Sequence, residues 1–241
     1  MTSPSPAPCP GTPAERPATR RRLLAALALL VGLTASTPRS DAASADDTAL
    51  IAAAERGDSA AVRSLLARGA SVTARDNRGR TALLVATHGN HVEIARALIA
   101  AGSDVNARDA IDDSPYLYAG AEGRTEILRL TLAHGADPAS VNRYGGTALI
   151  PAAHHGHVDA VRMLLGTRID VNHVNRLGWT ALLEAVILGD GGPVHTRIVE
   201  FLLAGGANPN LADRGGITPL AHARQRGYRA MAAAIEKAGG R

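Results

Sequence analysis

The sequence has very little cysteine and few aromatic residues, and both shortages limit what it can build. Its one cysteine, Cys9, lies in a leader rich in proline, serine and threonine, so a chain trimmed after that leader has no thiol. Disulfide bonds, Cys–zinc sites and cysteine nucleophiles are therefore excluded from the trimmed protein. Aromatic residues make up 2% of the 241 residues, whereas hydrophobic residues make up 46%. Alanine, valine and leucine must form the core, and thin layers of such side chains suit stacked helices.

The sequence also lacks the motifs of common enzyme sites. It contains no Gly-x-Ser-x-Gly, His-Glu-x-x-His, phosphate-binding loop or dinucleotide fingerprint. Glu122, Glu184 and Asp190 could supply carboxylates for acid–base chemistry, but no two of them have a distinguishing spacing. The run Gly189–Gly192 is interpreted as a flexible loop. We therefore predict no catalytic residue, no cofactor and no enzymatic activity.

Residues 1–45 have the organisation of an export signal. Arg20-Arg21-Arg22 precedes the short apolar run Leu23–Leu33, and the small residues Ala43-Ser44-Ala45 follow, which predicts cleavage before Asp46. The apolar run is too short to cross a bilayer, which needs about 20 residues, so a retained membrane anchor is the weaker alternative. Thr19–Leu24 also resembles a twin-arginine signal, and the general secretory and twin-arginine routes both stay open. The expected location is periplasmic or secreted.

The basic character of the chain belongs largely to this leader. The whole chain has 26 basic and 22 acidic residues, and removal of residues 1–45 takes away five arginines and two acidic residues. Residues 46–241 then carry 21 basic and 20 acidic side chains, a net charge of +1. This balance does not favour nucleic-acid binding, which exploits a broad positive field.

A repeat of 33 residues organises the rest of the chain. A threonine or serine that opens a Thr-Ala/Pro-Leu motif recurs at steps of 33, 33, 33, 33 and 38 residues, at Thr48, Thr81, Ser114, Thr147, Thr180 and Thr218. A small turn residue recurs nine positions later, at Gly57, Asn90, Gly123, Gly156, Gly189 and Gly227. A second glycine recurs 21 positions after the threonine at Gly69, Gly102, Gly135 and Gly239, and 26 positions after it at Gly206 in the longer fifth unit. Because separate markers keep one register over six copies, we predict six structural units.

Each unit is predicted to be a pair of helices. The threonine or serine is expected to cap a first helix, and the later glycine to stop a second helix in the left-handed conformation. The second helices carry apolar residues at helical spacing, as at Val161, Leu164 and Leu165. A hairpin-like loop such as 104–109 then leads into the next unit.

Four departures from the repeat are visible. The fifth unit gains five residues, which we expect in its inter-helix loop around Asp190–Val194. Arg168 occupies a helix-stop position, where a left-handed side chain costs about 1 kcal/mol. Thr131 stands at a position where the other units carry a core leucine or similar residue. Glu236 and Lys237 are expected to form a polar end cap, which terminal repeats need for solubility.

The unit resembles the ankyrin repeat, whose 33 residues carry a T-P-L-H-x-A signature. The residues that carry the resemblance are Thr218-Pro219-Leu220, Gly156-His157-Val158 and Gly102–Asn106. The chain looks most like the exported ankyrin proteins of bacteria. The resemblance implies an all-α ankyrin solenoid over residues 46–241, with units near 46–75, 76–108, 109–141, 142–174, 175–212 and 213–241.

The resemblance also implies a concave face that binds another protein through residues the fold does not fix. These are loop-tip residues before each threonine and residues before each turn glycine. The candidates are Arg78, Arg80, His88, Glu122, Arg143, Tyr144, His154, His155, Arg176, Leu177, Trp179, Ile187, Leu188, Arg214 and Arg226. Arginine and aromatic residues are enriched in interface hot spots. We expect Trp179 to be an exposed anchor at the centre of this face, and the alternative is that it packs between units.

Several functional alternatives remain. The run His154-His155-Gly156-His157 invites a metal reading, but no carboxylate or fourth ligand has a fitting spacing, so we predict no metal. The leading hypothesis is a protein-interaction module, monomeric alone and without a membrane anchor after cleavage, that acts in the cell envelope or outside the cell. The second is an accessory subunit that protects or assembles an exported enzyme. The third is an enzyme with an unrecognised site in the long fifth-unit loop.

Overall fold

The computed structural model describes residues 45–241, and residues 1–44, which hold almost all of the predicted export signal, lie outside the described part. Residues 45–241 form twelve helices and no strand. The helices are α1 Ala45–Glu55, α2 Ser59–Ala67, α3 Ala82–His88, α4 Val92–Ala100, α5 Pro115–Ala121, α6 Thr125–Ala133, α7 Leu149–His154, α8 Val158–Leu165, α9 Ala181–Ile187, α10 Pro193–Ala204, α11 Pro219–Gln225 and α12 Arg229–Lys237. None of these helices is long and apolar enough to span a bilayer.

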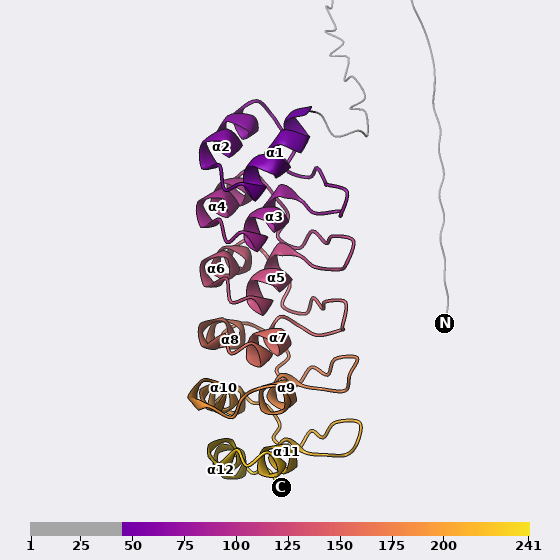
Figure 1. The fold of residues 1–241 in the computed structure, drawn as a ribbon, viewed down its shortest axis with the longest axis vertical. Coiled ribbons are helices and arrows are strands. Elements are labelled where there is room, and N and C mark those ends of the chain that lie inside the picture. The colour runs from indigo at the N-terminus through magenta and orange to yellow at the C-terminus, as the bar shows by residue number, and fades with distance from the viewer. Residues whose placement is uncertain (1–44) are drawn as a thin grey trace, which may run out of the picture. The chain divides into compact units, whose positions relative to one another are not determined.

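The helices form two layers that run along the stack of units. The odd-numbered helices pack against one another in one layer, the even-numbered helices in the other, and the loops between units project beside the odd-numbered layer (Figure 1). The core lies between the layers and consists of small and aliphatic side chains such as Leu50, Leu83, Leu98 and Leu164. The predicted all-α solenoid of six helix pairs is therefore confirmed. At its C-terminal end Glu236 and Lys237 are exposed, as expected of a polar cap.

Four of the six predicted helix caps are confirmed. The hydroxyl groups of Thr81, Ser114, Thr180 and Thr218 each accept a hydrogen bond from the backbone N–H three residues later. The prediction for Thr48 is wrong, because α1 already runs from Ala45 and Thr48 lies exposed inside it. Asp46 and Asp47 occupy the first turn of α1, where acidic side chains favour the helix N-terminus.

The prediction for Thr147 is also wrong, and a proline explains why. In the capped units the residue four positions after the threonine donates its N–H to the threonine carbonyl, as Glu184 does to Thr180 at 2.9 Å. In the fourth unit that residue is Pro151, which has no N–H. Ile150 donates to the Thr147 carbonyl at 3.2 Å instead, and α7 begins only at Leu149.

The fourth unit ends its second helix without a left-handed residue. In the described chain Asn90 and Asp112 are the non-glycine residues with positive φ, so the expected left-handed Arg168 is wrong. The Thr167 hydroxyl donates to the Leu164 carbonyl at 2.6 Å and accepts from the Ile169 N–H at 3.2 Å. In other units a backbone bond such as Ser103 N–H to the Leu98 carbonyl closes this turn directly. The threonine side chain replaces that bond and removes the need for glycine.

The additional residues of the fifth unit do not all enter its loop. The loop between α9 and α10 covers 188–192, whereas 89–91 suffices between α3 and α4. Helix α10 has 12 residues where α4 has nine. The extra length is therefore shared between the loop and an extended helix, and the left-handed residue moves from the Gly189 position to Gly191, whose φ is 72°.

An aspartate or asparagine organises every loop between units. Its side-chain oxygen accepts the N–H groups two and four residues later, at Asp76, Asp109, Asn142, Asn175 and Asp213. The same residue pairs through its own N–H with the carbonyl four residues on, as Asn175 does with Trp179 at 3.0 Å. Each loop is thereby a closed, preorganised turn that fixes the direction of its tip residues.

Asparagine side chains also tie neighbouring units together. Asn172 donates to the Gly206 carbonyl at 3.2 Å and accepts from the Asn208 N–H at 2.7 Å. Asn106 and Asn210 make the same pair of bonds to the units that follow them. These bridges join the end of one second helix to the loop of the preceding unit and hold the spacing between units.

We predict that Asn172→Ala lowers the free energy of unfolding by about 1 kcal/mol, because it removes two hydrogen bonds between units. For a chain of this length that corresponds to a Tm lower by roughly 2–4 °C. The matched control is Asn77→Ala at an exposed loop tip, which should change stability by less than about 0.5 kcal/mol. Equal thermal denaturation curves for the two variants would show that the bridge does not stabilise the stack.

Candidate protein-binding groove

The loops between units and the helices α5, α7 and α9 enclose one side of a groove in the middle of the stack. Its cavity measures about 410 Å³. The lining residues are Asp113, Leu117, Tyr118, Ala121, Glu122, Asn142, Arg143, Tyr144, Gly146, Ile150, Pro151, His154, His155, Asn175, Leu177, Glu184 and Leu188. The groove therefore spans the third, fourth and fifth units.

Large apolar side chains are exposed along the groove. The side chain of Tyr144 is 56% exposed, that of Leu177 52% and that of Leu188 42%. Tyr144 and Leu177 occupy equivalent loop-tip positions in neighbouring units. The backbone N–H of each is bound by the side chain of the residue two positions earlier, Asn142 or Asn175. Leu188 directly follows the end of α9 and also lines the groove. A partner that covered these side chains would gain the free energy of removing apolar surface from water.

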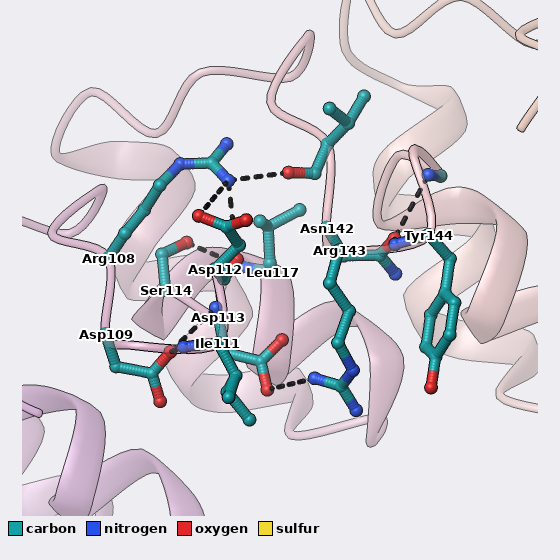
Figure 2. Close-up of polar contacts among 12 residues, drawn as sticks. Arg108, Asp109, Ile111, Asp112, Asp113, Ser114, Leu117, Asn142, Arg143 and Tyr144 are labelled. Atoms are coloured by element: carbon teal, nitrogen blue, oxygen red, sulfur yellow. Dashed lines mark hydrogen bonds and ion pairs between the residues drawn. The ribbon is translucent and has the colours of Figure 1, made fainter. Parts of the chain in front are cut away.

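An ion pair between units stands at one end of the groove. The Arg143 guanidinium lies 3.2 Å from the Asp113 carboxylate and 4.9 Å from the centre of the Tyr144 ring (Figure 2). Burial raises the pKa of Asp113 despite the attraction of Arg143. The pair crosses from the loop of the third unit to the loop of the fourth unit, so it positions the exposed Tyr144 ring as well as neutralising Asp113.

Glu184 is a buried carboxylate in the floor of the groove. Only 7% of it is exposed, and its Oε1 accepts a hydrogen bond of 2.9 Å from the Asn175 amide. Its Oε2 lies 3.9 Å from Nδ1 of His154. Burial raises the pKa of Glu184, while the bond from Asn175 and the field of His155 lower it less. A buried carboxylate with a neutral main partner is costly, so its place in this floor requires a functional explanation.

Glu184 has a register that explains its orientation. It stands four residues after the capping Thr180, and the equivalent residues are Val85, Tyr118, Pro151 and His222. Three neighbours in this row, Tyr118, Pro151 and Glu184, line the groove together. The last unit has a polar pair at the same two positions as Asn175 and Glu184. There, Nε2 of His222 lies 2.7 Å from the Asp213 carboxylate. The fourth position after the threonine or serine thus supplies one groove residue from each of the third, fourth and fifth units.

The histidines beside the groove are held by backbone carbonyl groups. Nδ1 of His155 lies 2.9 Å from the Ala121 carbonyl oxygen, and Nε2 of His195 lies 2.9 Å from that of His154. The His154 and His155 rings are 4.5 Å apart, and burial, followed by the fields of His155 and His195, lowers the pKa of His154. Within residues 45–241 no group of three or more His, Cys, Asp or Glu side chains is placed to hold a metal ion.

With this geometry in view, comparison with known proteins places the chain in a family. The family profile "Ankyrin repeats (3 copies)" matches residues 19–109 and 116–213. The chain belongs to the ankyrin-repeat family. Ankyrin repeats mediate protein–protein interaction, and nothing in the matched relatives indicates catalysis.

Solved ankyrin structures share the whole architecture. A crystal structure of an ankyrin repeat domain from Acinetobacter baumannii AYE is 57% identical, with a TM-score of 0.78, and the match covers 80% of this chain and 98% of that one. The crystal structure of the ankyrin repeat protein EF0377 is 43% identical, with a TM-score of 0.77, over 79% of this chain and 98% of that one. The ankyrin repeat protein YahD of Escherichia coli (strain K12) is 46% identical over 56 residues, which are 23% of this chain and 28% of YahD.

Seven of the predicted binding residues of this ankyrin-repeat protein meet in the groove. They are Glu122, Arg143, Tyr144, His154, His155, Leu177 and Leu188. Trp179 does not line the groove, and it is partly buried, so the expectation of an exposed central anchor is wrong. Its backbone N–H donates to the Asn175 side chain and its carbonyl accepts from the Asn175 N–H, so Trp179 lies at the closed base of the turn.

Three of the other predicted arginines bind within the protein. Arg80 is only 13% exposed at its side chain and pairs with Asp76 at 2.7 Å. Arg176 donates to the Arg143 carbonyl at 2.7 Å, and Arg214 donates to the Arg176 carbonyl at 2.5 Å. These two bonds join successive loops, so part of the donor capacity expected for a partner already stabilises the row of loops.

The remaining predicted residues lie outside the groove lining. Nη1 of Arg226 is 3.2 Å from Nδ1 of His222 in the last unit, and the His88 ring lies 4.0 Å from the Tyr118 ring. Arg78 is exposed on the loop of the second unit, and Ile187 is partly buried in α9.

The sequence reasoning did not place Asn175 or Glu184 in the binding face. A signal for the first was available, because aspartate or asparagine recurs five residues before the capping threonine or serine in every unit after the first. The sequence indicates Glu184 only as one of three carboxylates that could supply acid–base chemistry. Its Oε1 accepts a hydrogen bond from the Asn175 amide nine residues earlier in the same unit, and periodicity alone does not show that this pair is buried.

We predict that Glu184→Gln raises the Tm at pH 7.5, because the amide keeps an acceptor for Asn175 and removes a buried charge. Burial raises the folded-state pKa of Glu184, so the wild-type carboxyl favours the folded state below its ordinary pKa of 4.5 and loses this contribution as the pH rises through the higher folded value. The Tm advantage of the variant should therefore close towards pH 4.5. A pH-independent loss of stability in Glu184→Gln would contradict this account.

Proposed function

We propose that the protein binds a partner protein through the groove between the third and fifth units. The observation that carries the proposal is the concentration of exposed Tyr144, Leu177 and Leu188 around a cavity whose lining includes the buried carboxylate of Glu184. Exposed apolar side chains rimmed by polar residues are typical of interaction sites. Preorganised loops favour affinity, since little conformational entropy is lost when they bind.

We also propose that the protein acts in the cell envelope or outside the cell. The support is the sequence of residues 20–45, with its arginines, apolar run and small residues. Helix α1 runs from Ala45, so cleavage before Asp46 would leave the twelve described helices almost intact. Asp46 itself pairs with Arg68 at 2.9 Å and would remain in place.

We predict that a Tyr144→Ser/Leu177→Ser double variant captures partner proteins about ten-fold less well than the wild type, with little change in Tm. Both side chains are exposed, so their loss should affect binding far more than folding. The measurement is quantitative mass spectrometry of proteins retained from an envelope fraction of the native host. The matched control is Val174→Ser, whose side chain is 50% exposed and does not line the groove.

Equal loss of the same partners in the double variant and in Val174→Ser would contradict the groove proposal. A single exported enzyme retained in stoichiometric amount by the wild type would favour the accessory-subunit alternative over a general interaction module. Turnover of a substrate by the isolated chain would contradict both.

For the location, we predict a mature N-terminus at or near Asp46 in protein recovered from the native host. Replacement of Arg20 and Arg21 by lysine should block export if the twin-arginine route is used and leave it largely intact if the general secretory route is used. N-terminal sequencing and fractionation measure both outcomes. Full-length protein confined to the cytosol would reject the proposed location.

A further inference from the structure

The charges that line the groove are unequal. Asp113, Glu122 and Glu184 contribute three carboxylates, whereas Arg143 contributes the single guanidinium. Arg143 already pairs with Asp113 and lies against the Tyr144 ring. Glu122 and Glu184 therefore leave the cavity with an excess of negative charge that no arginine or lysine of its lining neutralises.

Glu184 has acceptor capacity that the protein does not use. Its Oε1 is bound by the neutral Asn175 amide, while its Oε2 has only the His154 ring nitrogen nearby, at 3.9 Å, beyond hydrogen-bond distance. Burial lowers the pKa of His154, which disfavours its positively charged form. The carboxylate is more than nine-tenths buried and lines the cavity, so a donor that entered the groove would satisfy it.

Aliphatic side chains flank this carboxylate. Leu177 and Leu188 are both exposed and line the same cavity as Glu184, and Ile150 lies in its floor. A lysine or arginine side chain combines these requirements, because its methylene stem packs on apolar surface while its charged end donates several hydrogen bonds. A free anion or an acidic segment would instead meet two carboxylates.

We propose that the groove recognises an extended segment of a partner protein that carries a lysine or arginine next to an aliphatic residue. The positive end group pairs with Glu184 in the cavity, where Glu122 adds to the negative charge of the lining, and the aliphatic neighbour covers Leu177 and Leu188. This inference rests on the proposed function and adds the chemistry that selects the partner. The buried carboxylate decides between partners, since a segment without a cation leaves it unsatisfied.

The test is selection of a displayed library of random short peptides on the full chain, followed by affinity measurements with the selected peptides. We expect lysine or arginine beside leucine, isoleucine, valine or methionine in the selected sequences. Glu184→Gln should weaken their binding about ten-fold or more, equivalent to about 1.4 kcal/mol, without lowering the Tm. Glu122→Gln is the second groove variant, and Glu126→Gln on α6, in the other helix layer, is the matched control that should bind like the wild type.

The outcomes separate this inference from the proposed function. One outcome would overturn the charge inference but leave the groove as the binding site. In that outcome the peptides contain no cation, bind Glu184→Gln and Glu122→Gln as well as the wild type, and lose binding to Tyr144→Ser/Leu177→Ser. Peptides that are insensitive to all of these variants, or no groove-dependent peptide at all, would overturn both. A salt-dependent affinity that Glu184→Gln abolishes would support the proposed pairing, because a purely structural role of Glu184 would not produce it.

Discussion

The spacing between neighbouring units is the constraint on which this structure depends. No unit of two short helices can bury its own apolar face, so each relies on the units on either side. Two kinds of polar contact hold the spacing. An aspartate or asparagine closes each loop, and asparagine bridges such as that of Asn172 join one unit to the next. Where a side chain departs from the pattern, as at Thr167, it restores the lost hydrogen bonds in another way.

The binding groove follows from this spacing because each unit contributes the same positions to it. The floor position after the cap carries a different residue in each unit, and the loops add Tyr144 and Leu177 above it. A change at one floor position therefore alters the chemistry of the groove and leaves the helices in place. Glu184 shows the cost of such a change, since it buries a carboxylate that the stack alone does not need.

Much of the fold could be predicted from the sequence, because threonine or serine residues and turn glycines recur with a 33-residue period. The failures have local causes. Pro151 cannot donate the hydrogen bond that closes the first turn of its helix, so the Thr147 cap is lost. Thr167 supplies a side-chain bridge that makes a left-handed Arg168 unnecessary.

The binding site was predictable only in part, because loop-tip positions are not equally exposed. The equivalents of Trp179 in other units include Arg80, Asp113 and Gly146, and this range of charge and size predicts an exposed position. The side chains of Arg80 and Asp113 are in fact only 13% and 17% exposed, and each pairs with a charged neighbour. The variation at the residue before each threonine or serine therefore reflects different side chains that fit a partly buried position, and it does not indicate exposure. Contacts across units, such as that of Arg143 with Asp113, depend on distances that periodicity does not provide.

Hydrogen exchange of the full chain, with and without a captured partner or selected peptide, tests most directly whether the groove is the binding surface. We expect slower exchange in the loops 109–114, 142–147 and 175–180 and at the ends of α7 and α9, with little change in α4, α6 and α8. Protection confined to those even-numbered helices, with unchanged exchange in the loops, would contradict the account.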